Sequence, residues 1–200
     1  MSVVTETQLA LKEWAVTIDY LARGEQIVLL RKGGIREERR RFEVQGERFF
    51  LYPTFDHQRP DLLKEEYRPT LEAIGFQSPT ETVHITHAAQ ITDALVTTRS
   101  ETVDALQPYY IWTTDYAMER LKWKRRQPLH ILLLRVHALE EPMSVTVDES
   151  YLGCRSWIDL KEPILQRSST PVLDDEVYEK QRRAILDVIQ FTEEQGEKSS

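Results

Sequence analysis

One segment of this chain constrains the fold more than any other, because both of its faces are apolar. It runs from Leu129 to Leu139 and is rich in aliphatic side chains. At the two-residue period of a strand, its faces carry Ile131 and Leu133 on one side, and Leu132, Leu134 and Val136 on the other. A strand that is apolar on both faces is covered on both, as in the middle of a sheet. The segment is therefore predicted to be a central, doubly covered strand.

Helical and strand patterns mix irregularly along the rest of the chain. Apolar side chains at three- and four-residue spacing predict helices, mainly over Thr7–Leu21, Thr113–Arg126 and Asp174–Phe191. Further strands are expected over Gln26–Arg31 and Arg48–Tyr52, and within Thr82–Thr97 and Tyr151–Leu160. Because strands and helices do not alternate strictly, we expect an α+β (mixed α/β) fold. Its centre would be a mixed or antiparallel sheet, which could close into a small barrel, flanked by helices.

The length of 200 residues is that of one ordinary domain. Residues 1–165 are predicted to form a single globular α/β domain. Residues 166–173 are rich in serine and contain Pro171, so they are expected to be a linker. Residues 174–200 are predicted to form an amphipathic helix that ends in a frayed acidic tail.

Composition narrows the class of protein. Hydrophobic residues make up 40% of the chain and charged residues 30%, as in ordinary globular proteins. No apolar run approaches the roughly 20 residues that span a bilayer, and the first residues show no secretory signal pattern. Cys154 is the only cysteine, which excludes an internal disulfide and a multi-cysteine zinc site. We therefore expect a cytoplasmic protein with no membrane partner.

The net charge of −7 disfavours binding of DNA by the surface as a whole, but the charge is uneven. Basic residues outnumber acidic ones over Arg31–Arg48 and over Glu119–Arg126, whereas acidic residues dominate from Asp174 onward. This distribution allows a basic patch on an acidic protein.

The first candidate binding motif follows the strand that ends at Arg31. Arg31 and Lys32 stand directly before a turn formed by Gly33 and Gly34. Backbone amides in such a turn can form an anion-binding nest, and the arginine fork fits a phosphate or a carboxylate. The spaced glycine and the Lys-Ser/Thr pair of a P-loop are missing. The alternative is an ordinary turn whose charged side chains extend into solvent.

Arg135 ends an apolar run of the central strand in the way that Arg31 ends its own strand. Their shared apolar character predicts that the two strands lie in one sheet. A charge on an apolar strand face needs solvent, a carboxylate or a ligand, so both arginines could converge on one anion. A structural salt bridge is the alternative.

A third candidate site lies in the loop after Tyr52. Thr54, His57 and Gln58 offer a hydroxyl, an imidazole and an amide in a segment where binding residues often occur. His57 could also act as a catalytic acid or base, since histidine exchanges protons near neutral pH. Cys154 lacks the context of known cysteine-protease nucleophiles, and there is no Gly-x-Ser-x-Gly elbow. Whether the chain is an enzyme stays open.

The histidines show no metal-site pattern. His84 and His87 are three residues apart, but no further ligand is spaced as in a known zinc motif. His130 and His137 are an odd number of residues apart, so on one strand they face opposite ways. We predict no bound metal and no cofactor.

An aromatic stripe lies on the helix predicted before the central strand. Trp112, Tyr116 and Trp123 fall within roughly 40° of one another around a helix axis, and Arg120 and Arg126 flank them. Interleaved rings and arginines can stack nucleobases and hold phosphates. The alternative is that the rings are part of the core.

Several strings of residues carry a family resemblance. In chain order they are Leu11-Lys12-Glu13-Trp14, Leu29-Leu30-Arg31-Lys32-Gly33-Gly34-Ile35, Pro53-Thr54 with His57-Gln58, and Tyr151-x-Gly153-Cys154-x-Ser156-Trp157. Over Leu9 to Leu160, the chain resembles the bacterial family known as domain of unknown function 1802. The resemblance implies no defined activity. Members of the family occur beside a restriction-endonuclease-type domain, which implies a role near restriction–modification.

A second resemblance concerns the fold. The stretch from Leu21 to Arg31 is similar to the opening of PUA-like and ASCH-like barrels, where a helix and a turn precede a strand that ends in arginine. This likeness implies modified bases or RNA as ligands.

Together these features predict a nucleic-acid-linked, anion-binding module whose partner is a nucleic acid or a phosphorylated ligand. The candidate ligand-binding residues are Arg31, Lys32, Gly33, Gly34, Thr54, His57, Gln58 and Arg135. The alternatives are an enzyme acting on a small phosphorylated or nucleotide substrate, and an interaction protein with no ligand site. What distinguishes these functions is whether the strand ends at Arg31 and Arg135 and the loop around His57 meet in one cleft.

Overall fold

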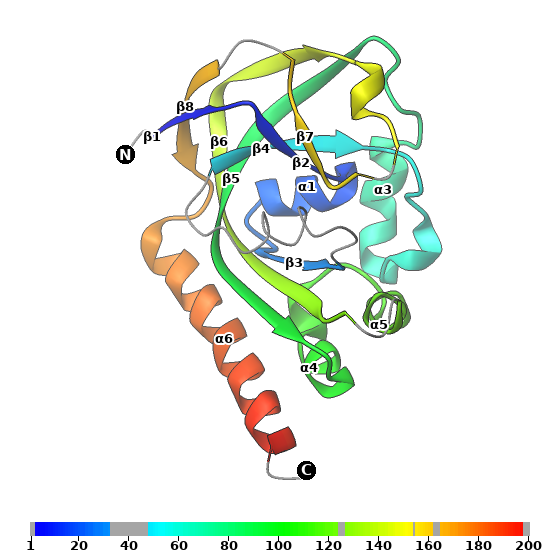
Figure 1. Ribbon diagram of the computed structural model, residues 1–200, viewed down its shortest axis with the longest axis vertical. Helices are drawn as coiled ribbons and strands as arrows, with labels where there is room; N and C mark the ends of the chain where they lie inside the picture. The colour runs from blue at the N-terminus through cyan, green and yellow to red at the C-terminus, as the bar shows by residue number, and fades with distance from the viewer. Residues whose placement is uncertain (1–2, 33–47, 124–126, 154, 162–164, 198–200) are drawn as a thin grey trace.

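Strand β6 (Leu129–Thr146) lies at the centre of the sheet, as Figure 1 shows. The computed structural model describes residues 3–32, 48–123, 127–153, 155–161 and 165–197. Strands β3 (Val28–Arg31), β5 (Thr82–Thr97) and β8 (Leu165–Pro171) all pair with β6. The five aliphatic side chains between Ile131 and Val136 are at most 5% exposed. The prediction of a central, doubly covered strand is therefore confirmed.

The sheet mixes parallel and antiparallel pairs. Its remaining strands are β1 (Val3–Thr7), β2 (Leu9–Trp14), β4 (Arg48–Thr54) and β7 (Trp157–Asp159). Their order is β1-β8-β6-β5-β4-β2-β7, with β3 pairing with β6 off this path. Among the described strands, β2 and β4 run parallel and the other pairs run antiparallel. The expected mixed sheet is therefore confirmed.

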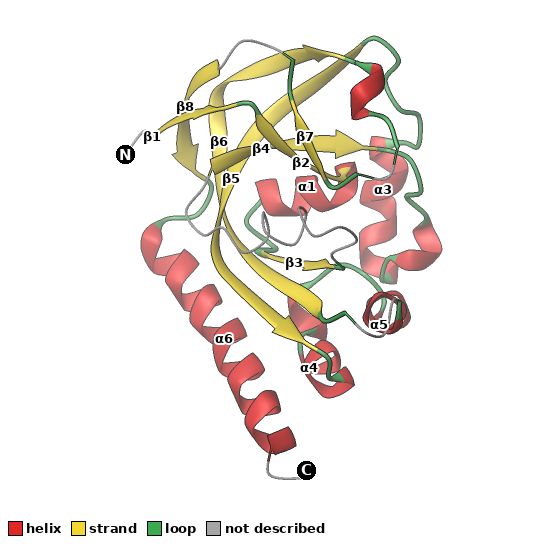
Figure 2. Cartoon of the chain, in the orientation of Figure 1, coloured by secondary structure: helices red, strands yellow, loops and turns green. Residues whose placement is uncertain are grey.

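The two longest strands, β5 and β6, curl the sheet into a half-barrel (Figure 2). The register of their pairing shifts between Ile85 and His87 and again between Ile91 and Asp93. Such bulges bend a strand and increase its twist. Helix α1 (Ala15–Ala22) lies within this curl and contributes buried side chains to the core.

Hydrophobic side chains gather on both sides of the sheet. Successive residues of β4 alternate between two buried clusters, with Phe49 and Leu51 in the larger one and Phe50 and Tyr52 in the smaller one. The other helices are α3 (Arg68–Ile74), α4 (Ser100–Ala105), α5 (Thr114–Lys122) and α6 (Asp175–Glu197). Short 3-10 turns lie at Pro60–Leu62, Glu65–Tyr67, Gln107–Tyr109 and Glu149–Tyr151. Within the described ranges, no helix has both the length and the hydropathy to cross a membrane.

The helix predicted over Thr7–Leu21 is wrong in its first half, which forms strand β2, and only α1 is helical. In β2, Leu9 and Leu11 join the larger cluster and Ala10 joins the smaller one. The apolar run at the start of β2, Leu9–Leu11, is too short for its pattern to distinguish a strand from the start of a helix. Pairing with β4 and β7, which lie far away in the sequence, decides its structure.

The segment predicted as a linker, residues 166–173, is also different in the structure. Most of it belongs to β8, which pairs with β1 on one side and with β6 on the other. Ser169 is fully buried, opposite both Val3 and Leu139. Serine and threonine are tolerated here because the neighbouring strands satisfy the backbone hydrogen bonds of β8.

Helix α6 covers most of residues 174–200, the segment predicted to be helical, and packs against the body of the molecule. Tyr178, Ile185 and Ile189 are buried in the larger cluster. Arg182 forms two hydrogen bonds of 2.6 Å, one to each carboxylate oxygen of Asp93 in β5. The helix is therefore joined to the sheet by apolar packing and by a bidentate ion pair.

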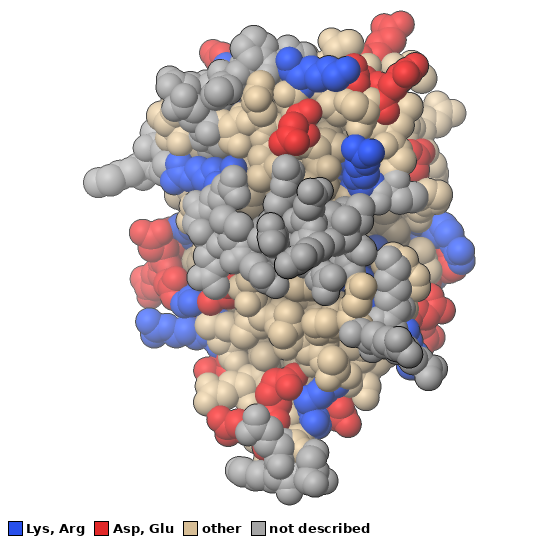
Figure 3. Space-filling view, in the orientation of Figure 1, with Lys and Arg blue, Asp and Glu red and all other residues tan. Residues whose placement is uncertain are grey.

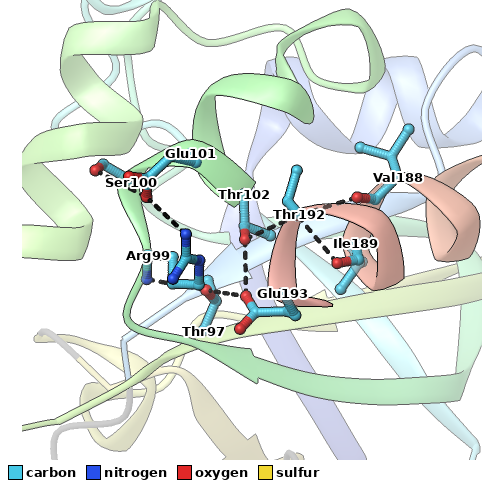
Figure 4. A network of polar contacts seen from close by, with 9 residues as sticks. All are labelled: Thr97, Arg99, Ser100, Glu101, Thr102, Val188, Ile189, Thr192 and Glu193. Carbon is cyan, nitrogen blue, oxygen red and sulfur yellow. Dashed lines mark hydrogen bonds and ion pairs between the residues drawn. The ribbon is translucent and has the colours of Figure 1, made fainter. Parts of the chain in front are cut away.

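A polar network joins the far end of α6 to the body (Figure 4). Glu193 Oε1 accepts hydrogen bonds of 2.7 Å from the hydroxyls of Thr97, in β5, and Thr102, in α4. The Thr192 hydroxyl donates to the Thr102 hydroxyl at 3.0 Å. Both Thr97 and Thr102 are buried, so Glu193 satisfies hydroxyls that would be costly to leave unpaired.

Candidate functional site

A cleft of about 1040 Å³ opens where strands β2 and β4 end. The two strands run parallel, with Trp14 opposite Thr54. The ends of parallel strands meet at one edge of a sheet, where ligands commonly bind. The end of β3, the loop after β4, helix α5 and the chain around Gly153 and Ser156 complete the lining.

One face of helix α5 forms a wall of the cleft. Tyr116, Glu119 and Arg120 line it, and their three- and four-residue spacing puts them on one side of the helix. Trp123, which directly follows the helix, lines the cleft as well. The hydroxyl of Thr113 caps the helix by accepting a 3.2 Å hydrogen bond from the Tyr116 amide. The predicted helix is therefore present, and its aromatic and charged face turns toward the cleft.

The rings of the predicted aromatic stripe divide between the core and the cleft. Trp112 is only 4% exposed and belongs to the core, whereas Trp123 is 54% exposed. Tyr116 stacks on Trp14, with ring centroids 5.3 Å apart and planes inclined by 23°. The Arg120 guanidinium lies 4.8 Å from the Tyr116 ring centre and donates to its hydroxyl. The cleft therefore carries stacked rings beside an arginine.

Arg31 lines the cleft and forms an ion pair with Glu13. Its Nη2 is 3.0 Å from Glu13 Oε2 and also donates to the carbonyl of Lys12. The Arg31 side chain is 12% exposed and that of Glu13 is 8% exposed. Glu13 Oε1 accepts a 2.8 Å hydrogen bond from the Trp14 amide. A carboxylate of the protein thus neutralises Arg31 inside the cleft.

Lys32 and Thr54 also line the cleft. Lys32 Nζ donates to the Leu121 carbonyl, near the end of α5, at 2.7 Å. Burial lowers the pKa of Lys32 and raises the pKa of Tyr116, since each charged form is less well solvated there. Thr54 Oγ1 donates to the Glu13 carbonyl at 3.0 Å. These contacts tie β2, β3, β4 and α5 together around the cleft.

His57 and Gln58 are neighbours in sequence but lie in different surroundings. His57 is exposed, lines the cleft and has a φ of 64°, in the left-handed region that residues other than glycine rarely adopt. Gln58 is buried, and its Oε1 accepts a 3.1 Å hydrogen bond from the Val16 amide at the start of α1. Gly33 and Gly34 lie outside the described residues.

The expected convergence of Arg31 and Arg135 is wrong, although their strands share the sheet as predicted. Strands β3 and β6 are antiparallel, with Arg31 opposite His130, so the two arginines lie at opposite ends of the pairing. Arg135 Nη2 is 2.6 Å from a carboxylate oxygen of Asp175, and its guanidinium lies 4.5 Å from the Tyr178 ring centre. Arg135 therefore holds α6 against the sheet and does not reach the Arg31 cleft.

The lining of the cleft is richer in cations than the whole chain. It contains six basic and three acidic residues: Lys12, Arg31, Lys32, Arg59, Arg120 and Arg155 against Glu13, Asp56 and Glu119. The chain as a whole carries a net charge of −7. On the face shown in Figure 3, basic and acidic side chains are interspersed. The basic excess at the cleft is therefore a local feature of an acidic protein.

Glu13, Trp14 and Arg155 line the cleft, although no sequence pattern singled them out as site residues. Glu13 and Trp14 end strand β2, which was expected to be helical, so their place at a strand end was not apparent. The strings that carry the family resemblance contain both residues, and that signal could have found them. Arg155 lines the cleft from within the string Tyr151-x-Gly153-Cys154-x-Ser156-Trp157, at a position that the string leaves unspecified.

The chemistry available in the cleft is that of cations, aromatic rings, a histidine and three carboxylates. Within the part of the chain that the structure describes, no group of three or more His, Cys, Asp or Glu side chains is placed to hold a metal ion. The arrangement suits a planar ligand that carries negative charge.

Two solved structures similar to this chain are mutants of the ZmASCH protein from Zymomonas mobilis. One is 11% identical, with a TM-score of 0.41, and the match covers 88% of this chain and 94% of that one. The other is 10% identical, with a TM-score of 0.42, and the match covers 77% of this chain and 90% of that one. Among curated proteins, no sequence matches the chain.

A family model gives the identification. The model described as Domain of unknown function (DUF1802) matches residues 10–184. This range contains the β2 and β3 strings and the His57 loop, on which the resemblance rested, and it extends into α6. The chain therefore belongs to the family of the domain of unknown function 1802.

Proposed function

We propose that the cleft binds single-stranded nucleic acid. The bases would stack on the aromatic rings of the cleft, and the phosphates would lie beside its basic side chains. The observation that carries this proposal is the meeting of Arg31, Lys32, Thr54 and His57 with stacked aromatic rings in one cleft. Single-strand-binding sites commonly combine a basic groove with rings on which unpaired bases stack. We further propose that the protein is bacterial and cytoplasmic and acts near restriction–modification.

The cations differ in how well they suit a phosphate. Arg155 is exposed, and Arg120 lies half-buried against Tyr116. Arg31, by contrast, is already paired with the buried Glu13 carboxylate. A phosphate is repelled by that carboxylate, so we assign phosphate contacts to Arg120 and Arg155. Arg31, Lys32, Thr54 and His57 then contact the other parts of the nucleotide.

Binding is tested with labelled uridine and thymidine octamers, by fluorescence anisotropy and by quenching of tryptophan fluorescence. We expect the affinity to fall about tenfold from ~50 mM to ~200 mM salt, as two or three phosphate contacts require. Trp123→Ala should weaken binding about tenfold through lost stacking. Arg155→Ala should weaken binding to both octamers and reduce the salt slope by about one.

The matched control is Arg23→Ala, because Arg23 pairs with Asp19 outside the cleft. This variant should bind as the wild type does. Absence of binding to either octamer at low salt would contradict the proposed function, and so would an equal loss in the Arg23 variant.

His57 supports a second candidate function, an enzyme acting on a small phosphorylated or nucleotide substrate. Its backbone lies in a sparsely populated region and its imidazole is exposed at the cleft. Unusual backbone geometry of this kind concentrates at functional sites. Turnover of a nucleotide that is lost in His57→Asn, which tolerates the same φ, would favour the enzyme over the binding module.

A further inference from the structure

Resting on the proposed function, we propose that Arg31 and Glu13 together read the Watson–Crick edge of an unpaired guanine. The two side chains form an ion pair that lines the cleft. The ring of Trp14, the next residue after Glu13, lies in the same lining and stacks on Tyr116. A base held against this group of rings can bring its edge to the ion pair.

Glu13 has acceptor capacity that its protein partners do not use. Its Oε2 pairs with Arg31 at 3.0 Å, and its Oε1 accepts from the Trp14 amide at 2.8 Å. A carboxylate has about four acceptor positions on its two oxygens. The observed contacts take one position on each oxygen, so each oxygen can accept another hydrogen bond.

Arg31 likewise retains donors. Its Nη2 serves both Glu13 and the Lys12 carbonyl. Among the residues that the structure describes, Nη1 of Arg31 makes no hydrogen bond, whereas Nε is buried and faces away from any ligand in the cleft. Because a guanidinium has five N–H donors, the pair offers a donor from Arg31 beside two acceptors from Glu13.

Guanine alone among the common bases complements this order of donor, acceptor, acceptor. Its Watson–Crick edge presents the O6 acceptor, then the N1–H and N2–H donors. Adenine presents one amino donor and the single acceptor N1, cytosine presents one amino donor followed by two acceptors, and uracil presents one donor between two acceptors. Burial of the ion pair strengthens the discrimination, since a mismatched base leaves a charged group unpaired in a site of low dielectric.

This assignment also explains why the recognised base must be unpaired. In a duplex, the Watson–Crick edge of guanine is occupied by cytosine. Reading by Arg31 and Glu13 therefore requires a single strand, as the stacking rings of the cleft do. The ion pair then provides base preference, while the cations outside it provide affinity that does not depend on sequence.

The first experiment uses the wild-type chain with pyrimidine octamers that differ only in one central base. We expect central guanine to bind about tenfold more tightly than central adenine, cytosine or uracil, as one bidentate pair provides. Central hypoxanthine, which lacks the 2-amino group, should lose most of this preference. This comparison needs no variant, so it holds even if changes to the buried ion pair impair folding.

The second experiment uses Glu13→Gln, which keeps the size of the side chain but removes its charge and one acceptor. The preference for guanine, taken as the ratio of the affinities that this one variant shows for the central-guanine and central-uracil octamers, should fall to within about twofold. Glu141→Gln, an exposed change in β6 outside the cleft, is the matched control and should keep the preference. The melting temperature of each variant shows that it is folded.

The outcomes separate the two proposals. Failure of every octamer to bind rejects the proposed function and this inference together. Binding without a preference for guanine rejects the inference alone, as does a preference that hypoxanthine or Glu13→Gln leaves intact. A preference for guanine that both changes abolish supports the reading of the base by this ion pair.

Discussion

At the scale of single residues, His137 shows how the fold alters the chemistry of a side chain. It lies in β6 and is 5% exposed. In the described part of the chain, neither of its ring nitrogens has a hydrogen-bond partner. Burial, together with the positive charges of Arg48 and Arg135, lowers the pKa of His137 to about 4. The folded protein therefore keeps this ring neutral well below neutral pH.

This shift predicts a loss of stability in acid. The unfolded chain binds the proton near the ordinary histidine pKa of about 6.5, and the folded chain only near 4. Stability is thus fully present above about pH 6.5 and is lost as the pH falls toward 4, by about 3 kcal/mol. Replacement of His137 with Leu should remove this part of the pH dependence.

Urea unfolding at several pH values between neutrality and about pH 4 measures the effect. His84→Leu is the control, since His84 lies exposed on β5, and its pH dependence should match that of the wild type. If the wild type and His137→Leu lose equal stability on acidification, the assignment to His137 is wrong.

Among the secondary-structure elements, β6 pairs with more strands than any other described strand does. It pairs with β3, β5 and β8, and its aliphatic side chains lie between layers on both faces. Helix α5 shows the converse arrangement, because it contributes Ala117 to the core while Tyr116 and Arg120 face the cleft. The buried side chains of β6 therefore stabilise the fold, whereas the cleft-facing side of α5 gives the cleft aromatic and basic side chains.

For β6, Leu132→Ala should lower the free energy of unfolding by roughly 2–5 kcal/mol, the cost of a cavity in a packed core. Leu132 is fully buried, with Leu29 opposite it in β3 and Ala94 opposite it in β5. The same substitution at Leu152, which is 60% exposed, should cost less than about 0.5 kcal/mol. Equal costs at the two positions, measured by urea denaturation, would be inconsistent with the central position of β6.

At the scale of the whole molecule, the two ends of the chain belong to one folded unit. Strand β8 pairs with β1, and α6 is joined to the sheet through Arg182, Arg135 and Glu193. The buried side chains of α6 belong to the same cluster as those of β3 and β6. We therefore expect α6 to unfold together with the sheet.

All four tryptophans lie outside α6, so their fluorescence reports the body, whereas circular dichroism at far-ultraviolet wavelengths also reports the helix. The unfolding curves recorded by tryptophan fluorescence and by circular dichroism should coincide, as they do in a two-state transition. Ile185→Ala in α6 should shift both curves together, by roughly 2–5 kcal/mol. An earlier transition seen by circular dichroism alone would show that α6 unfolds separately.

Elements with a local sequence pattern could be predicted before the structure was known. The doubly apolar run of β6 requires cover on both faces, and the spacing of α5 and α6 requires helices. The same reasoning identified Arg31, Lys32, Thr54 and His57, because each of them lies at or just after a strand end. The structure places all four in the cleft.

Features that depend on pairing between distant segments could be found only in the folded structure. The direction of β3 against β6 separates Arg31 from Arg135, and no local pattern encodes that direction. Strands β2 and β8 form because partners far along the chain satisfy their backbone hydrogen bonds. For the same reason the Arg31–Glu13 pair could not be predicted. A contact between two strand ends exists only after the sheet has brought them together, and its free energy depends on the burial that the whole fold supplies.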